Sequence, residues 1–101
     1  MSNGTKVKKR DGRIEPLDLE KMHLMVEEAC TGIAGVSASQ VEMKSGIQFY
    51  DGITTAEIQE ILIKSASDLI DLDHPNYQFV AARLLLFALR KQLYGKMREL
   101  P

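Results

Sequence analysis

The segment Phe79–Leu89 reads FVAARLLLFAL, and every position in it except Arg83 is apolar. It follows Asp73-His74-Pro75, where proline suits a first helical turn. The sequence therefore predicts a helix over about residues 75–95. Because a helix that is apolar nearly all round is normally surrounded by other elements, we expect this one at the centre of a small bundle.

Three more helices are predicted upstream, each with residues typical of a helix start. Asp18 can cap a helix over about residues 18–33, where Leu17 and Met22 stand at the positions of a hydrophobic staple. Apolar residues then recur at helical spacing.

The other two helices open with capping-box patterns. Ser37-x-x-Gln40 begins a helix over about residues 37–50, and Thr54-x-x-Glu57 begins one over about residues 54–72. Asp51-Gly52 separates the two.

A β-hairpin is predicted over about residues 5–16. Asp11-Gly12 is a dipeptide favoured in two-residue type I′ turns, and Pro16 should end the second strand. The turn pairs Arg10 with Arg13, Lys9 with Ile14, and Lys8 with Glu15. Because side chains alternate along a strand, one face then carries Val7, Lys9 and Ile14, and the other carries Lys8, Arg10, Arg13 and Glu15.

These elements predict a mainly α fold of the α+β type, in which a four-helix bundle is capped by a short N-terminal β-hairpin. With 101 residues the chain has room for one core, so we expect a single domain over residues 1–101. The single Cys30 excludes an internal disulfide and a cysteine zinc cluster. No signal sequence opens the chain and its apolar run is too short to cross a membrane, so we expect a cytoplasmic protein.

Positive charge is concentrated at the two ends of the chain. Residues 1–13 hold five basic side chains against Asp11, and residues 83–101 hold five against Glu99, although the net charge is −1. Two basic ends around an acidic middle suit an anionic ligand if folding brings the ends together. The alternative is ordinary solvated surface charge.

Catalysis within this chain is not indicated. His23 and His74 are the only histidines, and neither has an obvious Cys or Ser partner. The sequence has neither a Walker-type loop nor a dinucleotide-binding glycine fingerprint. Anion binding is better supported, since Lys9 and Arg10 precede a tight turn whose second strand leads into a helix start at Asp18.

Segments spread along the chain resemble the ATP-cone of class I, specifically class Ia, ribonucleotide reductase large (alpha) subunits. In order, they are Val7–Gly12, Val36–Glu42, Ile47–Ile53, Asn76–Arg83 and Leu89–Gly95. The resemblance implies that the chain is a fragment of a larger protein, ribonucleoside-diphosphate reductase, which makes deoxyribonucleotides for DNA synthesis. The fragment itself would hold no catalytic residue.

The resemblance also implies the ligand and the partners. An ATP-cone binds ATP or dATP with Mg²⁺ and sets overall activity, ATP permitting turnover and dATP favouring an inhibited oligomer. Its partners would be the rest of the large subunit and the radical-generating small (beta) subunit, with no nucleic acid and no membrane.

The resemblance also implies which residues form the nucleotide site, position by position. Lys9, Arg10 and Lys91 match phosphate-binding positions, and Thr55 matches a hydroxyl at the same pocket. The strand-to-helix segment around adenine and ribose is matched by Glu15, Leu17, Asp18, Lys21 and Met22, and Val7 would line the wall. Two positions depart from many relatives: Asp18 stands in place of Asn, and Gln59, near the sugar, stands in place of His. Asp18 bears on the recognition of adenine, since a carboxylate cannot donate to a ring nitrogen, and Gln59 bears on the discrimination between ATP and dATP.

Three other interpretations stay open. The first is the nucleotide-sensing cone of a transcriptional repressor of reductase genes, whose family places a zinc ribbon before the cone. The second is a small helical nucleic-acid-binding domain, against which the acidic middle argues. The third is a structural bundle with the hairpin as a lid.

Overall fold

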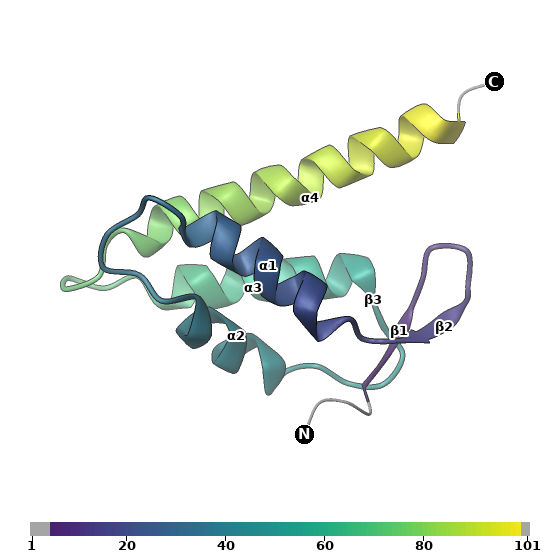
Figure 1. The fold of residues 1–101 in the computed structure, drawn as a ribbon, viewed down its shortest axis with the longest axis horizontal. Helices are drawn as coiled ribbons and strands as arrows, with labels where there is room; N and C mark the ends of the chain where they lie inside the picture. Colours follow the sequence, from purple (N-terminus) through teal and green to yellow (C-terminus); the bar gives the residue numbers. More distant parts are fainter. Residues whose placement is uncertain (1–4, 100–101) are drawn as a thin grey trace.

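The computed structural model describes residues 5–99, with side chains described as far as Leu93. These residues form four helices and a small sheet (Figure 1). The helices are α1 (Leu19–Cys30), α2 (Ala38–Gly46), α3 (Thr55–Asp68) and α4 (Tyr77–Glu99), and the strands are β1 (Lys6–Lys8), β2 (Ile14–Pro16) and β3 (Ile53–Thr54). The expected mainly α fold is confirmed, while residues 1–4 and 100–101 of the predicted domain lie outside the described residues.

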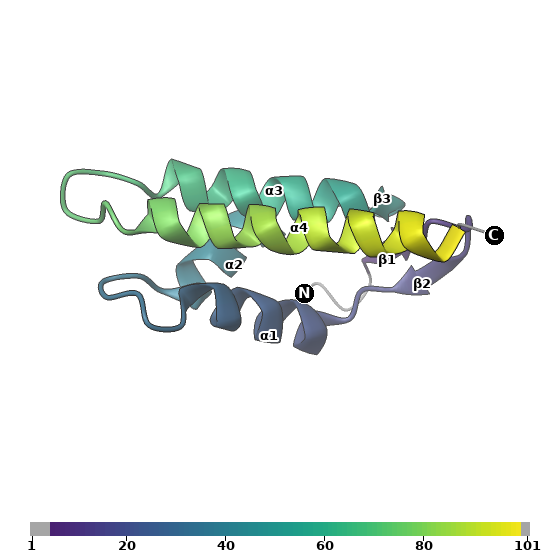
Figure 2. The same ribbon diagram turned by 90° about the horizontal axis from the view of Figure 1, so that it is seen from above.

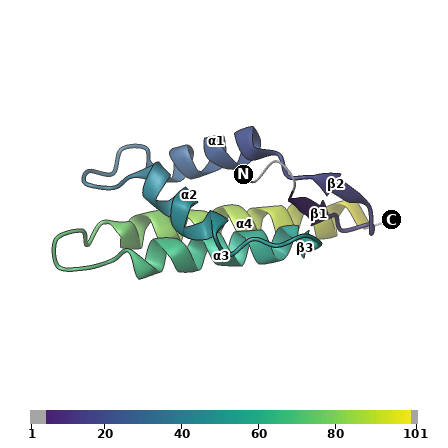
Figure 3. The same ribbon diagram turned by 90° about the horizontal axis from the view of Figure 1, so that it is seen from below.

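The helices pack in a ring. α3 lies along α4, α2 packs against α3, and α1 packs against both α2 and α4. Figure 2 shows the two long helices side by side with α1 beside them, and the opposite view shows α2 completing the bundle (Figure 3). The sheet lies at the end of the bundle where α1 and α3 begin (Figure 1).

The predicted starts of the first three helices are confirmed, while α4 begins at Tyr77, two residues after the predicted start at Pro75. Asp18 Oδ1 accepts a hydrogen bond from the Lys21 N–H at 3.0 Å, and Ser37 caps α2 in the same way. At α3 the capping box is reciprocal. Thr54 Oγ1 accepts from the Glu57 N–H at 3.1 Å, and Glu57 Oε1 accepts from the Thr54 N–H at 3.1 Å. A side-chain cap involves residues that lie within three positions of one another, which explains why these helix starts could be predicted from the sequence.

The predicted ends of the first three helices are wrong, since each helix stops earlier, while α4 runs on to Glu99. α2 shows why. Beyond Gly46 the N–H groups of Gln48 and Phe49 donate to carbonyls three residues back, and Phe49 turns in against the core. The chain must then be extended at Ile53 to join the sheet, so residues 47–52 form a connection instead of a helical turn.

The predicted hairpin register is wrong by one residue. The observed pairs are Lys6–Pro16, Val7–Glu15 and Lys8–Ile14. The Gly12 N–H donates to the Lys9 carbonyl at 2.9 Å, and Gly12 has a φ of 92°, which marks a three-residue loop with a left-handed glycine at its end. The extra residue moves Ile14 to the solvent side, where it is 56% exposed, and brings Glu15 opposite Val7.

A third strand was not predicted. β3 pairs in parallel with β1, Val7 beside Ile53 and Lys8 beside Thr54. Asp51 supports this pairing because its Oδ1 accepts from the Lys6 N–H at 2.9 Å. The sheet order is therefore β2-β1-β3, and it joins the hairpin directly to the start of α3.

The core lies between the helices and under β1, and α4 is not its centre, contrary to the expectation from its apolar sequence. One face of α4 is buried through Tyr77, Val80, Leu84 and Ala88. The opposite face leaves large apolar side chains about half exposed: Phe79, Leu85, Leu86, Leu89 and Leu93. The bundle covers one side of this helix only.

Candidate functional site

Two adjoining cavities open where the sheet, the start of α3 and the second half of α4 meet. The first, the basic cavity, has a volume of about 470 Å³ and is lined by Lys8, Lys9, Arg10, Thr54, Thr55, Ala56, Gln59, Lys91 and Gln92. The second, the apolar cavity, has a volume of about 390 Å³ and is lined by Val7, Lys9, Pro16, Leu17, Asp18, Lys21, Met22, Met25, Thr55, Ile58, Gln59, Phe87 and Lys91. Because four residues line both cavities, the two form one continuous cleft.

The basic cavity draws its cations from two distant parts of the chain. Lys9 and Arg10 come from the end of β1 and the hairpin turn, and Lys91 comes from α4. The two basic ends therefore approach each other, which is the condition under which the charge distribution suits an anionic ligand. The side chains of Lys96 and Arg98 lie outside the described residues.

Hydroxyls complete the basic cavity at the N-terminus of α3. Thr54 is the N-cap and Thr55 is the first residue of this helix, and both line the cavity. The positive end of the α3 dipole therefore adds to the cations of β1 and α4. The Thr54 hydroxyl already donates to Glu57 Oε1 at 2.9 Å, so the helix dipole and Thr55 are what the first turn of α3 offers to a negatively charged occupant.

The electrostatics of Lys91 show that the cations are crowded. Partial burial lowers the pKa of Lys91, and the positive charges of Lys21 and Lys9 lower it further. Within residues 5–93 no carboxylate forms an ion pair with any of these three lysines. A polyanion between them would remove this repulsion.

The apolar cavity has a different character. Leu17, Met22, Ile58 and Phe87 supply apolar walls from the sheet-to-helix connection and from three helices. Asp18 supplies a polar group, and its Oδ1 already accepts from the Lys21 N–H. A flat apolar ring with polar atoms on its edge fits such a wall.

The structure brings most of the predicted site residues to this cleft. Val7, Leu17, Asp18, Lys21 and Met22 line the apolar cavity, and Arg10 lines the basic one. The residues common to both are Lys9, Thr55, Gln59 and Lys91. Glu15 lines neither, and its carboxylate instead pairs with the Arg13 guanidinium at 3.1 Å.

Several lining residues were missed by the sequence analysis. Met25 lies one helical turn beyond Met22, and Gln92 directly follows Lys91. Their positions relative to the predicted site residues could therefore have indicated Met25 and Gln92 as lining residues. Lys8 could not have been found in this way, because the β1–β3 pairing that places it beside Thr54 was not predicted.

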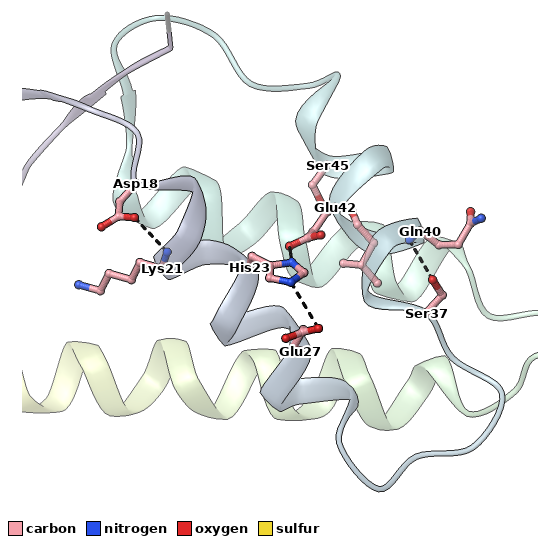
Figure 4. A network of polar contacts seen from close by, with 9 residues as sticks. Asp18, Lys21, His23, Glu27, Ser37, Gln40, Glu42 and Ser45 are labelled. Atoms are coloured by element: carbon pink, nitrogen blue, oxygen red, sulfur yellow. Dashed lines mark hydrogen bonds and ion pairs between the residues drawn. The ribbon is translucent and has the colours of Figure 1, made fainter. Parts of the chain in front are cut away.

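A second polar cluster lies away from the cleft and joins α1 to α2. His23 Nδ1 is 2.7 Å from Glu42 Oε1, and His23 Nε2 is 3.3 Å from Glu27 Oε2 (Figure 4). The hydrogen bond to Glu42 and its charge raise the pKa of His23. Among residues 5–99 no group of His, Cys, Asp and Glu is arranged to hold a metal ion.

Comparison with known proteins gives one family. The model of the ATP cone domain matches residues 5–92. Ribonucleoside-diphosphate reductase 1 subunit alpha of Salmonella typhimurium is 51% identical over 96 residues, and so is that of Escherichia coli; in each case the match covers 95% of this chain. The alpha subunit of Helicobacter pylori is 49% identical over 89 residues, or 88% of this chain.

The chain is much shorter than these relatives, spanning 13% of the length of the first two and 11% of the third. None of the helices among the described residues has the length and apolar character needed to cross a membrane.

Proposed function

Since the chain belongs to the ATP-cone family, we propose that it is the nucleotide-binding regulatory domain of a ribonucleoside-diphosphate reductase alpha subunit. Its ligands in this proposal are ATP and dATP, bound in the cleft between the sheet, α3 and α4. The observation that carries the proposal is the convergence of Lys9, Lys21 and Lys91, without carboxylate partners in residues 5–93, beside an apolar cavity.

In this proposal the triphosphate lies in the basic cavity. Lys9, Arg10 and Lys91 form charge-assisted hydrogen bonds with phosphate oxygens, and Thr55 donates its hydroxyl at the start of α3. Mg²⁺ enters with the nucleotide and is held by its phosphates. Among the described residues that line the basic cavity there is no carboxylate or imidazole to take a proton from an attacking water, which supports binding of the phosphates without their hydrolysis.

Adenine lies in the apolar cavity, against Leu17, Met22 and Phe87. Asp18 can accept a hydrogen bond from the exocyclic amino group, but a carboxylate cannot donate to a ring nitrogen. The ring nitrogen would then pair with water or be left unpaired. A buried ring nitrogen without a partner costs about 1–3 kcal/mol of binding free energy.

The sugar lies where the two cavities join. Gln59 lines both, so its side chain amide is the group suited to sense a 2′-hydroxyl. Glu15, also expected at the sugar and adenine side from the resemblance, pairs with Arg13 in the hairpin beside the cleft, and its part in binding stays a prediction.

The proposed regulation acts on the whole enzyme, in which ATP permits turnover and dATP favours an inhibited complex with the radical-generating beta subunit. Ribonucleotide reduction itself belongs to the much longer remainder of such a subunit. The repressor interpretation is not favoured, because the relatives that match are reductase alpha subunits.

Thermal unfolding with added ligands tests the binding proposal. ATP or dATP at 100 times its dissociation constant should add about 2.7 kcal/mol of stability, which is a melting shift on the order of 10 °C for a domain of this size. Tripolyphosphate and adenosine, each offered alone, should bind more weakly than ATP because each fills one cavity. A short DNA duplex should give no shift. Failure of both nucleotides at millimolar concentration would overturn the proposal.

A further inference from the structure

Lys91 is the residue of α4 that lines both cavities of the cleft. Lys9 also lines both and Lys21 lines the apolar cavity, so lysines from the hairpin, α1 and α4 converge there. Figure 2 shows the second half of α4 beside the sheet, which is how a residue so late in the chain meets the hairpin. Lys91 is nevertheless exposed to solvent, so a small molecule in the cleft can reach its amine.

The surroundings of Lys91 favour the neutral amine, which is the nucleophilic form of lysine. Partial burial lowers the pKa of Lys91, and the positive charges of Lys21 and Lys9 lower it further. Within residues 5–93 no carboxylate pairs with Lys91 to hold its proton. A lysine that is partly desolvated and close to other cations is a typical nucleophile. Lys91 is therefore suited to attack an electrophile that enters the cleft.

The cleft also indicates the class of electrophile. Its basic cavity suits a phosphate group, because Lys9 and the N-terminus of α3 at Thr55 both face it. An acyl phosphate joins such a phosphate to an activated carbonyl carbon, so binding of its phosphate would bring that carbon next to Lys91. The adjoining apolar cavity offers room for a short acyl chain.

We propose that Lys91 is a self-acylation site, at which an acyl phosphate bound in the basic cavity transfers its acyl group to the Lys91 side chain. The neutral Nζ attacks the carbonyl carbon, a C–N bond forms, and the C–O bond to the phosphate breaks. The phosphate leaves with the electron pair of that bond and takes the proton that the nitrogen releases, so no separate base is needed. The product is an uncharged amide.

Acylation would remove one of the three lysine charges in the cleft. This consequence rests on the proposed function, in which Lys91 contacts the triphosphate. An acylated Lys91 forms no charge-assisted hydrogen bond with a phosphate oxygen, so the domain would bind ATP and dATP more weakly. A supply of acyl phosphate would in this way reduce nucleotide control of the enzyme.

Incubation of the 101-residue chain with acetyl phosphate, without nucleotide, tests the transfer. Mass spectrometry of digested samples measures the acetylation of each lysine over time. Lys91 should be acetylated about tenfold faster than Lys64, an exposed lysine of α3 that lines neither cavity, because the bound donor is held beside the amine. Tripolyphosphate should abolish this preference by filling the basic cavity. Equal rates at Lys91 and Lys64 would overturn the proposal.

A neutral donor, the N-hydroxysuccinimide ester of acetic acid, separates binding of the phosphate from reactivity of the amine. Its preference for Lys91 should be smaller, since no phosphate holds it in the cleft. Lys21→Met should slow its reaction with Lys91, because the substitution removes a charge that favours the neutral amine. Lys44→Met, outside both cavities, should leave this rate unchanged.

The same preference with both donors, or an unchanged rate in Lys21→Met, would contradict the proposal. The melting shift of the unmodified chain with ATP reports separately on the proposed function, because that measurement involves no acyl transfer.

Discussion

Val7 and Ile53 lie side by side in the parallel pairing of β1 with β3, although they are far apart in the chain, and both are almost completely buried. Val7 also lines the apolar cavity, and the residue after Ile53 caps α3. This pair therefore sets the distance between the hairpin cations and the first turn of α3. The cleft depends on a contact that is part of the core.

Shortening Ile53 should weaken both the fold and the site. Ile53→Ala removes a fully buried side chain, so we expect the free energy of unfolding to fall by about 2–5 kcal/mol. Urea denaturation measures this loss. Ile47→Ala is the matched control, since Ile47 is 86% exposed, and it should change stability by less than about 0.5 kcal/mol. Equal effects of the two substitutions would show that β3 is not part of the core.

Removing the Lys91 charge should weaken triphosphate binding without unfolding the domain. One charge-assisted hydrogen bond is worth about 1.5–3 kcal/mol, so Lys91→Met should raise the Kd for ATP about tenfold to a hundredfold. The methionine keeps much of the packing of the lysine stem. Calorimetric titration gives the Kd, with Lys64→Met as control because Lys64 lines neither cavity. If Lys91→Met binds ATP as tightly as the parent, the triphosphate does not lie in the basic cavity.

His23 should make stability depend on pH. Its pKa is raised in the folded state by Glu42 and Glu27, so the contribution is fully present below the unfolded pKa of about 6.5. It is then lost as pH rises through the higher folded value. Urea midpoints between pH 5 and pH 8.5 should show the parent exceeding His23→Gln most at the acid end. Glu42→Gln should reduce the same difference, since Glu42 is the larger cause. A parent-minus-variant difference that grows toward high pH would contradict this assignment.

Much of the fold follows from local sequence chemistry, and the errors share one cause. The caps at Asp18, Ser37 and Thr54 act on N–H groups within a few residues, so the sequence located them. The loop that ends at Gly12 and the pairing of Val7 with Ile53 depend on how the chain closes in three dimensions. The apolar pattern alone could not distinguish a helix surrounded by its own bundle from a helix covered on one side only. For this reason α4 was wrongly expected at the centre of the bundle.

Most of the residues that line the cleft, but not all of them, could be predicted from the sequence. Lys9 and Lys91 were assigned through the family resemblance, and folding brings both to one cavity. Glu15 lines neither cavity; it pairs with Arg13, two residues earlier in the chain, and its assignment to the nucleotide site stays a prediction. Lys8 and Thr54 came to the cavity through the unpredicted third strand.

The last prediction concerns the whole alpha subunit with its beta partner. ATP and dATP differ only by the 2′-hydroxyl, so under the proposed function the domain would have to convert one polar group into a change of assembly. A ligand shifts an equilibrium only by its difference in affinity for the two states. One or two hydrogen bonds supply about 1–3 kcal/mol, which is a factor of roughly five to 150 and enough to switch an assembly near balance.

We therefore expect dATP to drive the alpha subunit and its beta partner into a larger, inactive complex, and ATP to reverse this. Light scattering of the mixture with each nucleotide, alongside an activity assay, measures both effects. Gln59→Ala is the informative variant, because Gln59 lines both cavities where the sugar would lie, and it should bring the masses with ATP and dATP closer together. Lys64→Met should leave the difference between the two masses unchanged. If ATP and dATP give identical masses and activities at saturation, this domain binds nucleotide without regulating assembly, and Asp18 and Gln59 are the first departures to examine.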